Sequence, residues 1–155
     1  MGRSAVVLAG GLSSRFGEDK GLLRLLGKPL VRHVLDVLRS VVDERVVVVS
    51  SDAQARSYRK AVGSDVEVAV DELEEQSPLV GTLAGFKTAS GEYCLLLPCD
   101  VPFVSVDVVA LLFDLCLRKA AVIPRWPNGY LAPLHSVYCR EVASDAAAKA
   151  LGEGK

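Results

Sequence analysis

Two kinds of apolar pattern alternate along the chain. Short runs of consecutive apolar residues, rich in valine and leucine, are separated by longer segments in which apolar residues recur every three or four positions. Uninterrupted apolar runs are typical of parallel strands, because helices cover both faces of a parallel sheet. The runs predict strands over residues 4–9, 45–50, 66–70, 93–97 and 121–124, and an extended segment over 132–138 that can pair antiparallel with its neighbours.

The longer segments predict helices over residues 30–42, 52–62, 78–89, 105–119 and 140–151. Asp52 near an N-cap, Pro78 in a first turn and Ser105 as an N-cap mark three of the helix starts. Strands that alternate with helices indicate an α/β fold, in which a mainly parallel, twisted sheet carries helices on both faces. A length of 155 residues suits a single domain.

The charge of the chain argues against polyanionic partners. The formal net charge is -1, and no basic stripe accompanies the one dense acidic stretch, at residues 71–75. This balance gives no electrostatic reason to expect nucleic acid or an anionic membrane as partner. No stretch approaches the roughly 18 apolar residues of a membrane helix, and the first apolar run is too short for a secretory signal.

The cysteines Cys94, Cys99, Cys116 and Cys139 include no Cys-x-x-Cys pair. We interpret them as reduced thiols that pack as small hydrophobic side chains, rather than as zinc ligands or disulfides. Together with the lack of a targeting segment, this predicts a cytoplasmic protein.

The connection between the first predicted strand and the first predicted helix, residues 10–29, is unusually long. Loops of about twenty residues inside compact domains are usually functional or disordered. Gly10 and Gly11 follow the strand directly, where adjacent glycines let backbone N–H groups approach phosphate oxygens. Arg15 adds a guanidinium fork and Lys20 a compact ammonium charge. These features together predict a phosphate-binding loop.

Two common glycine motifs do not match this loop. The dinucleotide fingerprint needs Gly-x-Gly-x-x-Gly leading directly into a helix, and the P-loop needs Gly-Lys-Ser/Thr at its end. Here the glycines are adjacent, and Lys20 is followed by Gly21. An ordinary glycine turn with surface cations is the alternative interpretation.

Asp100 comes just after the predicted strand at 93–97. Ligands of open α/β sheets bind at the carboxyl ends of the strands, where the glycine loop also begins. A carboxylate beside a triphosphate is repulsive unless a divalent cation lies between them, and Mg²⁺ commonly takes one or two protein carboxylates together with phosphate oxygens. We therefore interpret Asp100 as a magnesium ligand; an aspartate that only caps a turn is the alternative.

Residues 8–20, Leu-Ala-Gly-Gly-Leu-Ser-Ser-Arg-Phe-Gly-Glu-Asp-Lys, resemble the nucleotide-binding loop of the molybdenum cofactor guanylyltransferases. The continuation at 21–23 and 27–30 is similar to the same family, and residues 98–103, Pro-Cys-Asp-Val-Pro-Phe, are similar to its metal-binding segment. The resemblance implies a three-layer, Rossmann-like fold of the nucleotide-diphospho-sugar transferase type. It also implies that the nucleotide is held by Leu8, Ala9, Gly10, Gly11, Lys20 and Asp100.

The same resemblance singles out residues after two other strands. Asp71 precedes residues 78–81, which resemble the family's Pro-Leu-x-Gly, and would help to hold the nucleotide; a solvated acidic loop is the alternative. Ser50 matches a nucleotide-contacting position that is usually asparagine. His135 lies in a segment similar to the family's acceptor side, although a half-buried strand histidine explains it equally well. His33, on the polar face of the first helix, is expected to be solvated.

The activity that the resemblance implies is transfer of GMP from GTP to molybdopterin, or to its molybdenum-bearing form, with release of pyrophosphate and with Mg²⁺ as cofactor. The acceptor phosphate is already an anion, so catalysis would rest on alignment and on charge neutralisation by Arg15, Lys20 and Asp100. The alternatives are a molybdopterin cytidylyltransferase, a cobinamide-phosphate guanylyltransferase, a sugar-phosphate nucleotidyltransferase, and a non-catalytic nucleotide-binding module.

The resemblance covers residues 4–138. Family members normally continue with a further strand and helix, including a Phe-x-Asn-x-Asn-Thr-Pro-x-Asp-Leu segment that the 155-residue sequence does not contain. We therefore expect a single nucleotidyltransferase domain, residues 1–155, without those elements. The sequence leaves open whether the chain forms a homo-oligomer or works with a protein partner in cofactor biosynthesis.

Overall fold

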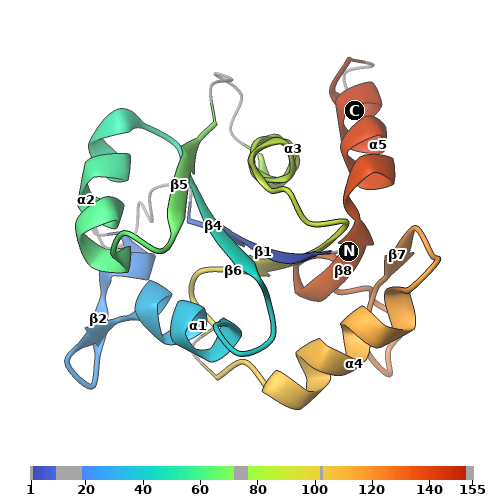
Figure 1. The fold of residues 1–155 in the computed structure, drawn as a ribbon, viewed down its shortest axis with the longest axis horizontal. Helices are drawn as coiled ribbons and strands as arrows, with labels where there is room; N and C mark the ends of the chain where they lie inside the picture. Colours follow the sequence, from blue (N-terminus) through green and yellow to red (C-terminus); the bar gives the residue numbers. More distant parts are fainter. Residues whose placement is uncertain (1, 10–18, 72–76, 102, 153–155) are drawn as a thin grey trace.

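A six-stranded sheet runs through the middle of the protein (Figure 1). The computed structural model describes residues 2–9, 19–71, 77–101 and 103–152. Across the sheet the strands lie in the order β5 (Glu67–Val70), β4 (Glu44–Val49), β1 (Arg3–Leu8), β6 (Tyr93–Pro98), β8 (Ser136–Cys139) and β7 (Ala121–Val122).

The strands β5, β4, β1 and β6 are parallel, whereas β8 runs antiparallel to β6, and β7 antiparallel to β8. Because parallel strands end on the same side of a sheet, the residues that follow them form one edge, which we call the carboxyl edge. It contains Asp71, Ser50, Ala9 and Cys99, which directly follow β5, β4, β1 and β6. Backbone hydrogen bonds extend the sheet to this edge: Ala9 donates to Val48 (2.8 Å), Cys99 to Leu8 (3.1 Å) and Asp71 to Val49 (2.9 Å).

Helices cover both faces of the sheet (Figure 1). Successive side chains of a strand point to opposite faces. Val6 and Val46 therefore join one core cluster, whereas Val7 and Val47 join the other. This arrangement explains the uninterrupted apolar runs and confirms the predicted three-layer α/β fold. The helices α3 (Pro78–Thr88) and α5 (Arg140–Gly152) pack on the first face, and α1 (Leu30–Leu38), α2 (Asp52–Val62) and α4 (Val106–Cys116) on the second.

Glycines in α3 bring that helix close to the centre of the sheet. A Cβ atom added to Gly85 would lie 2.3 Å from Cγ1 of Val6 and 3.0 Å from Cγ2 of Val48. One added to Gly81 would lie 3.2 Å from Cδ2 of Leu8. The spacing of the two glycines, four residues apart, places both on the helix face that meets β1 and β4.

The helix starts agree with the sequence better than the helix ends do. Ser105 caps α4 as predicted and accepts a hydrogen bond from the Val108 amide, but α2 is capped by Ser51, one residue before Asp52. The predictions for α1 and α4 run several residues too far, because α1 ends at Leu38 and α4 at Cys116. After α4, Arg118 has φ +65° and its amide donates to the Tyr93 hydroxyl at 2.8 Å, a tertiary contact that local sequence does not reveal.

The sequence predicts an extended segment over residues 132–138, but only part of this segment is extended in the structure. Pro133–His135 form a 3₁₀ turn, η2, and only Ser136–Cys139 pair with the sheet. The Ser136 hydroxyl donates to the carbonyl oxygen of Ala132 at 2.6 Å, which closes the turn. The strand predicted over 121–124 is likewise shorter, because only Ala121 and Val122 pair with β8.

The long connection between β1 and α1 contains ordered elements that the sequence analysis missed. Lys20–Leu22 form a 3₁₀ turn, η1, and β2 (Arg24–Leu25) pairs antiparallel with β3 (Lys28–Pro29). Leu26 and Gly27, the two residues between these strands, have φ values of +54° and +79°. Two-residue hairpins of one common type need positive φ at both turn positions, which accounts for Gly27.

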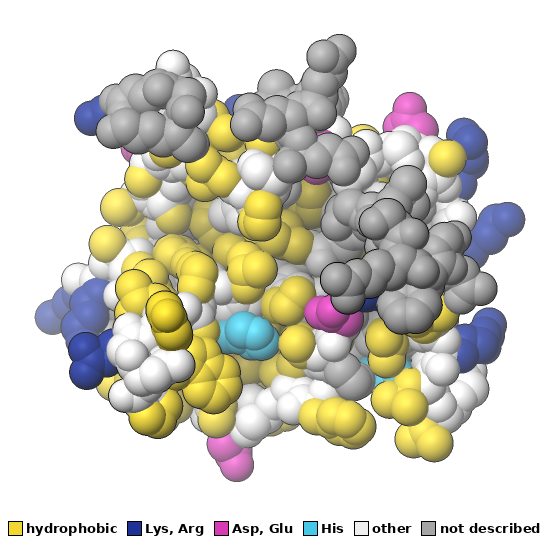
Figure 2. Space-filling view, turned by 180° about the vertical axis from the view of Figure 1, so that it is seen from behind, with side chains coloured by type: hydrophobic (Ala, Val, Ile, Leu, Met, Phe, Trp, Pro, Cys, Tyr) yellow, Lys and Arg dark blue, Asp and Glu magenta, His cyan; other side chains and the backbone are white. Residues whose placement is uncertain are grey.

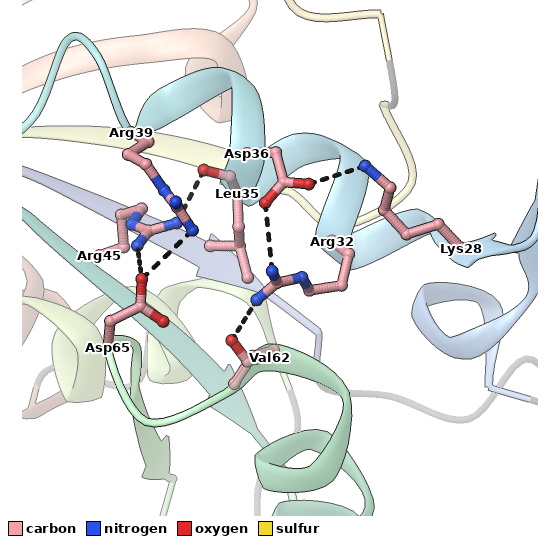
Figure 3. Close-up of polar contacts among 8 residues, drawn as sticks. All are labelled: Lys28, Arg32, Leu35, Asp36, Arg39, Arg45, Val62 and Asp65. Carbon is pink, nitrogen blue, oxygen red and sulfur yellow. Dashed lines mark hydrogen bonds and ion pairs between the residues drawn. The ribbon is translucent and has the colours of Figure 1, made fainter.

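Polar contacts hold α1 and the start of β4 together at the opposite edge of the sheet (Figure 3). Arg45 is only 7% exposed, and its guanidinium donates to the Leu35 carbonyl at 2.9 Å and to the Asp65 carboxylate at 2.5 Å. Arg32 donates to the Val62 carbonyl and lies 3.5 Å from Asp36. These contacts lie away from the carboxyl edge and connect α1, β4 and the loop after α2.

The interpretation of the cysteines as unpaired thiols is confirmed. Cys94, Cys99 and Cys116 are buried and Cys139 is half-buried, and none forms a disulfide. Burial raises the pKa values of the Cys94 and Cys99 thiols to about 12, so both stay protonated at neutral pH. Within the described part of the chain, no helix has the length and apolar character needed to cross a membrane.

Candidate functional site

Several of the residues predicted to form the site meet at the carboxyl edge. Leu8 is the last residue of β1, Ala9 follows it, and Ser50 and Asp71 follow the two neighbouring strands. Asp100 lies in the turn one residue beyond Cys99 and is exposed. Gly10, Gly11 and Arg15 fall outside the described residues.

Lys20 begins the 3₁₀ turn η1, and its neighbour Asp19 fixes the start of that turn. The Asp19 carboxylate accepts hydrogen bonds from the Gly21 amide at 3.1 Å and from the Tyr58 hydroxyl at 2.5 Å. It also accepts one from Nε2 of Gln54 at 2.5 Å. Lys20 itself is exposed. Three donors on one carboxylate therefore hold the backbone that carries this lysine.

Gln54 and Tyr58 are site residues that the sequence analysis missed. Both lie on α2, one turn apart, on the side that faces the carboxyl edge. Nε2 of Gln54 also donates to the Ala9 carbonyl at 2.9 Å, and its Oε1 accepts from the Ser50 amide at 2.7 Å. One weak signal was available in the sequence, since a tyrosine on the apolar face of a helix needs a partner for its hydroxyl.

The segments that carry Lys20 and Asp100 approach each other at Gly21. A Cβ atom on Gly21 would lie 2.1 Å from the Tyr58 hydroxyl oxygen and 3.0 Å from the Cys99 sulfur. Gly21 directly follows Lys20, and Cys99 directly precedes Asp100. The structure thus brings the two segments together on the same side of the sheet.

Asp71 is buried at the end of β5, with 9% of its surface exposed. Among the described residues, its Oδ1 atom has no hydrogen-bond partner. Burial raises the pKa of this carboxyl group. The residue lines a small cavity of about 330 Å³ together with Lys87 and Thr88 of α3. The alternative interpretation, a solvated acidic loop, therefore does not hold for Asp71.

A larger, mainly apolar hollow of about 540 Å³ opens beside the Asp100 turn. Its lining includes Val101, Val104 and Ser105, which lie beyond β6, together with Trp126 and His135. Figure 2 shows hydrophobic side chains gathered on this face around a histidine. His135 is exposed, in contrast to the half-buried strand position considered above. Aromatic residues at the edge of a turn usually pack against the protein. Trp126 is instead 62% exposed and does not lie in the core.

His33 has a structural role and is not the solvated residue expected from its helix face. It is half-buried, and its Nε2 atom lies 2.6 Å from the Leu25 carbonyl oxygen. The contact ties the β2–β3 hairpin to α1, away from Asp100 and the hollow.

Within the described residues there is no group of three or more His, Cys, Asp or Glu side chains able to enclose a metal ion. Asp100 instead offers one exposed carboxylate. Mg²⁺ commonly keeps several waters and binds through one or two carboxylates plus phosphate oxygens of a substrate. The residues present therefore suit a magnesium ion that arrives with a phosphate ligand rather than an all-protein cage.

Comparisons with known proteins identify the family to which the chain is similar. A model of the MobA-like NTP transferase domain matches residues 5–155. The chain is 35% identical to a protein of Natronomonas pharaonis named "Probable molybdenum cofactor guanylyltransferase", over 96% of this chain and 74% of that protein. A Pyrococcus horikoshii protein of the same name is 42% identical over 88% of this chain and 69% of its own.

The fold is also similar to solved structures. The crystal structure of molybdopterin-guanine dinucleotide biosynthesis protein A from Archaeoglobus fulgidus superposes with a TM-score of 0.79 at 26% identity. The match covers 97% of this chain and 74% of that one.

Proposed function

The chain belongs to the MobA-like NTP transferase family, and from this premise we propose that it transfers the GMP group of GTP to molybdopterin, or to its molybdenum-bearing form, with release of pyrophosphate. It is a nucleotidyltransferase, and the relatives named above support guanylyl transfer in molybdenum cofactor biosynthesis. The observation that carries the proposal is the meeting of the Lys20 and Asp100 segments at Gly21. That contact supports the proposal, because a cation and a carboxylate carried on neighbouring segments would suit a magnesium triphosphate bound between them.

The nucleotide is proposed to lie along the carboxyl edge, held by Leu8, Ala9, Gly10, Gly11, Ser50 and Asp71. The buried Oδ1 atom of Asp71 supports this placement, because an acceptor that has no partner among the described residues suits the N–H donors of a guanine ring. Leaving such an oxygen unsatisfied costs roughly 1–3 kcal/mol, which a bound donor would recover.

The chemistry is attack by the acceptor's phosphate oxygen on the α-phosphorus of GTP; that P–O bond forms while the bond to the β-phosphate oxygen breaks. The attacking oxygen is already an anion, so no general base is required. Lys20 and Arg15 are proposed to stabilise the negative charge that develops on the departing pyrophosphate. Asp100 is proposed to hold Mg²⁺, which when bound neutralises charge between the carboxylate and the phosphates.

The acceptor is proposed to occupy the apolar hollow beside Asp100. Its walls are mainly hydrophobic, and Trp126 offers an exposed ring on which a flat heterocycle can stack. Arg125 also lines the hollow and brings a positive charge for an anionic substituent. An acceptor placed there lies on the Asp100 side of the nucleotide, which the proposed attack requires.

The test is to compare Lys20→Ala and Asp100→Ala with the unmodified protein. Pyrophosphate release from GTP, molybdopterin and Mg²⁺ should fall roughly 100-fold or more in each variant, because a preorganised charge facing the transition state is lost. Lys119→Ala and Asp145→Ala are matched controls, since both residues are exposed and lie away from the carboxyl edge. Normal transfer by Lys20→Ala or Asp100→Ala would refute the proposed roles.

The choice of base is tested separately. With Mg²⁺ present, GTP should raise the melting temperature more than an equal concentration of CTP, ATP or UTP does, because a ligand that binds the folded state more tightly stabilises it more. A larger shift with CTP would favour a cytidylyltransferase instead.

A further inference from the structure

We propose that Tyr58 and Gln54 of α2 are positioning residues, which hold the segments of Lys20 and Asp100 at fixed positions relative to each other. The inference rests on the proposed function and assigns part of its catalytic alignment to a helix that touches neither substrate in that proposal.

Tyr58 stands where three segments of the chain meet. Its side chain is fully buried, and its hydroxyl donates to the Asp19 carboxylate at 2.5 Å. Burial raises the pKa of the Tyr58 hydroxyl, so the group stays protonated and keeps its donor role. The same hydroxyl oxygen would lie 2.1 Å from a Cβ on Gly21, and the Cys99 sulfur 3.0 Å from it. The ring therefore packs between the turn that begins with Lys20 and the residue before Asp100.

Gln54 links that junction to the strand ends. Its side-chain amide donates to the Asp19 carboxylate and to the Ala9 carbonyl, while its oxygen accepts from the Ser50 amide. One side chain thus uses both hydrogens and its oxygen to tie Asp19 to the ends of β1 and β4. A side chain with every polar group engaged in this way is fixed in one conformation.

Asp19 passes this restraint to Lys20, because its carboxylate also caps the turn that Lys20 begins. If Asp19 loses one of its hydrogen-bond donors, its carboxylate is held less firmly and caps the turn less well, directly before Lys20. Misplacement of a charge by about 1 Å can lower a rate as much as 100-fold, whereas binding of the rest of the nucleotide is affected less. The expected effect is therefore on kcat more than on the KM for GTP.

The experiment compares Tyr58→Phe with Tyr93→Phe in the full chain. Each variant removes one hydroxyl that makes a hydrogen bond, but Tyr93 begins β6 at the far edge and accepts from the Arg118 amide. We expect Tyr58→Phe to lower kcat at least about tenfold with the KM for GTP changed less than about threefold. Tyr93→Phe should keep the kcat of the unmodified protein, although its melting temperature falls as much as that of Tyr58→Phe.

A binding measurement gives a readout that a purely structural role would not move. By calorimetry, pyrophosphate with Mg²⁺ should bind more weakly to Tyr58→Phe than to Tyr93→Phe, and guanosine equally well to both. Should Tyr58→Phe fail to fold, Gln54→Met, which keeps the length of the side chain on a half-buried position, tests the same network.

Two outcomes would overturn the inference: a kcat for Tyr58→Phe within about twofold of the unmodified protein, or an equal loss of kcat in Tyr58→Phe and Tyr93→Phe. Either result, with Lys20→Ala still inactive, leaves the proposed function standing and removes only the positioning role. If the unmodified protein itself transfers no GMP, the proposed function fails, and the calorimetric comparison alone decides whether α2 positions the phosphate site.

Discussion

At the scale of single residues, the burial of the Asp71 carboxyl group lowers the stability of the protein when no ligand is bound. Its carboxyl is buried, and Oδ1 has no partner among the described residues. Burial raises its folded-state pKa, so the folded protein binds the proton more tightly than the unfolded chain does. Stability therefore falls as pH rises from the unfolded pKa of about 3.9 through the raised folded value.

The raised pKa of the Asp71 carboxyl leads to a prediction for Asp71→Asn. At pH 7 and without nucleotide, the neutral amide should raise the free energy of unfolding by about 1 kcal/mol, because no charge is buried. With GTP and Mg²⁺ present, the rise in melting temperature should be smaller than in the unmodified protein. Thermal unfolding with and without GTP measures both effects. A variant that is less stable without nucleotide would contradict the argument.

Residues in short, continuous motifs could be found from the sequence, and residues that act through packing could not. Lys20 and Asp100 follow recognisable strand and loop patterns, and the structure brings their segments together. Gln54 and Tyr58 act only because α2 lies against η1, a contact between residues more than thirty positions apart. No local sequence pattern predicts a contact between residues so far apart. The hydroxyl of Tyr58, which needs a partner, was the one sign that α2 contributes to the site.

At the scale of elements, α3 shows how a helix is matched to the sheet that it covers. Its two inward glycines, Gly81 and Gly85, remove side chains at the points where the helix meets Leu8, Val6 and Val48. A Cβ added to Gly85 would lie closer to its neighbour than one added to Gly81. That neighbour is the β-branched side chain of Val6, which cannot easily move away because few rotamers are open to it.

Gly85→Ala should therefore lower the free energy of unfolding by about 1–3 kcal/mol, since an added methyl overpacks the core beneath α3. Helix propensity alone would predict the opposite sign. Chemical denaturation measures the change, and Gly152→Ala is the control, because a Cβ there meets nothing within 4 Å. Equal stability of Gly85→Ala and the unmodified protein would show that α3 can shift outward at no cost.

Strand and helix identities followed from the sequence, but several ends did not. Apolar runs identified β1, β4, β5 and β6 because both faces of these strands are covered by helices. The end of α4 and the turn at Pro133–His135 depend instead on contacts such as that of Arg118 with Tyr93. Such contacts join segments distant in sequence, which periodicity does not report.

At the scale of the whole molecule, the two edges of the sheet carry different electrostatic arrangements. The carboxyl edge holds the proposed site, whereas the opposite edge buries Arg45 against the Leu35 carbonyl and Asp65 (Figure 3). The hydrogen bond from Arg45 holds the pKa of the Asp65 carboxyl below its usual range. A depressed pKa contributes stability that is present at neutral pH and is lost as pH falls through the folded value.

Asp65→Asn should lower the melting temperature at pH 7, because it leaves the buried Arg45 guanidinium without its carboxylate. The difference from the unmodified protein should shrink between about pH 5 and pH 2, where Asp65 becomes protonated in any case. Melting curves across this range provide the measurement, with Asp145→Asn as an exposed control. A difference that stays constant with pH would exclude the charge pair as its cause.

The strand order has a consequence for how the protein is made. Among the described strands, β1 precedes the others in the chain, yet it lies in the interior of the sheet between β4 and β6, and its second neighbour begins only at Tyr93. During synthesis, β1 therefore emerges from the ribosome as an apolar segment, and one of its two sides stays unpaired until β6 has been translated. Pairing of β1 on that side must wait for β6, and ribosome pausing before Tyr93 would prolong the exposure of an aggregation-prone strand.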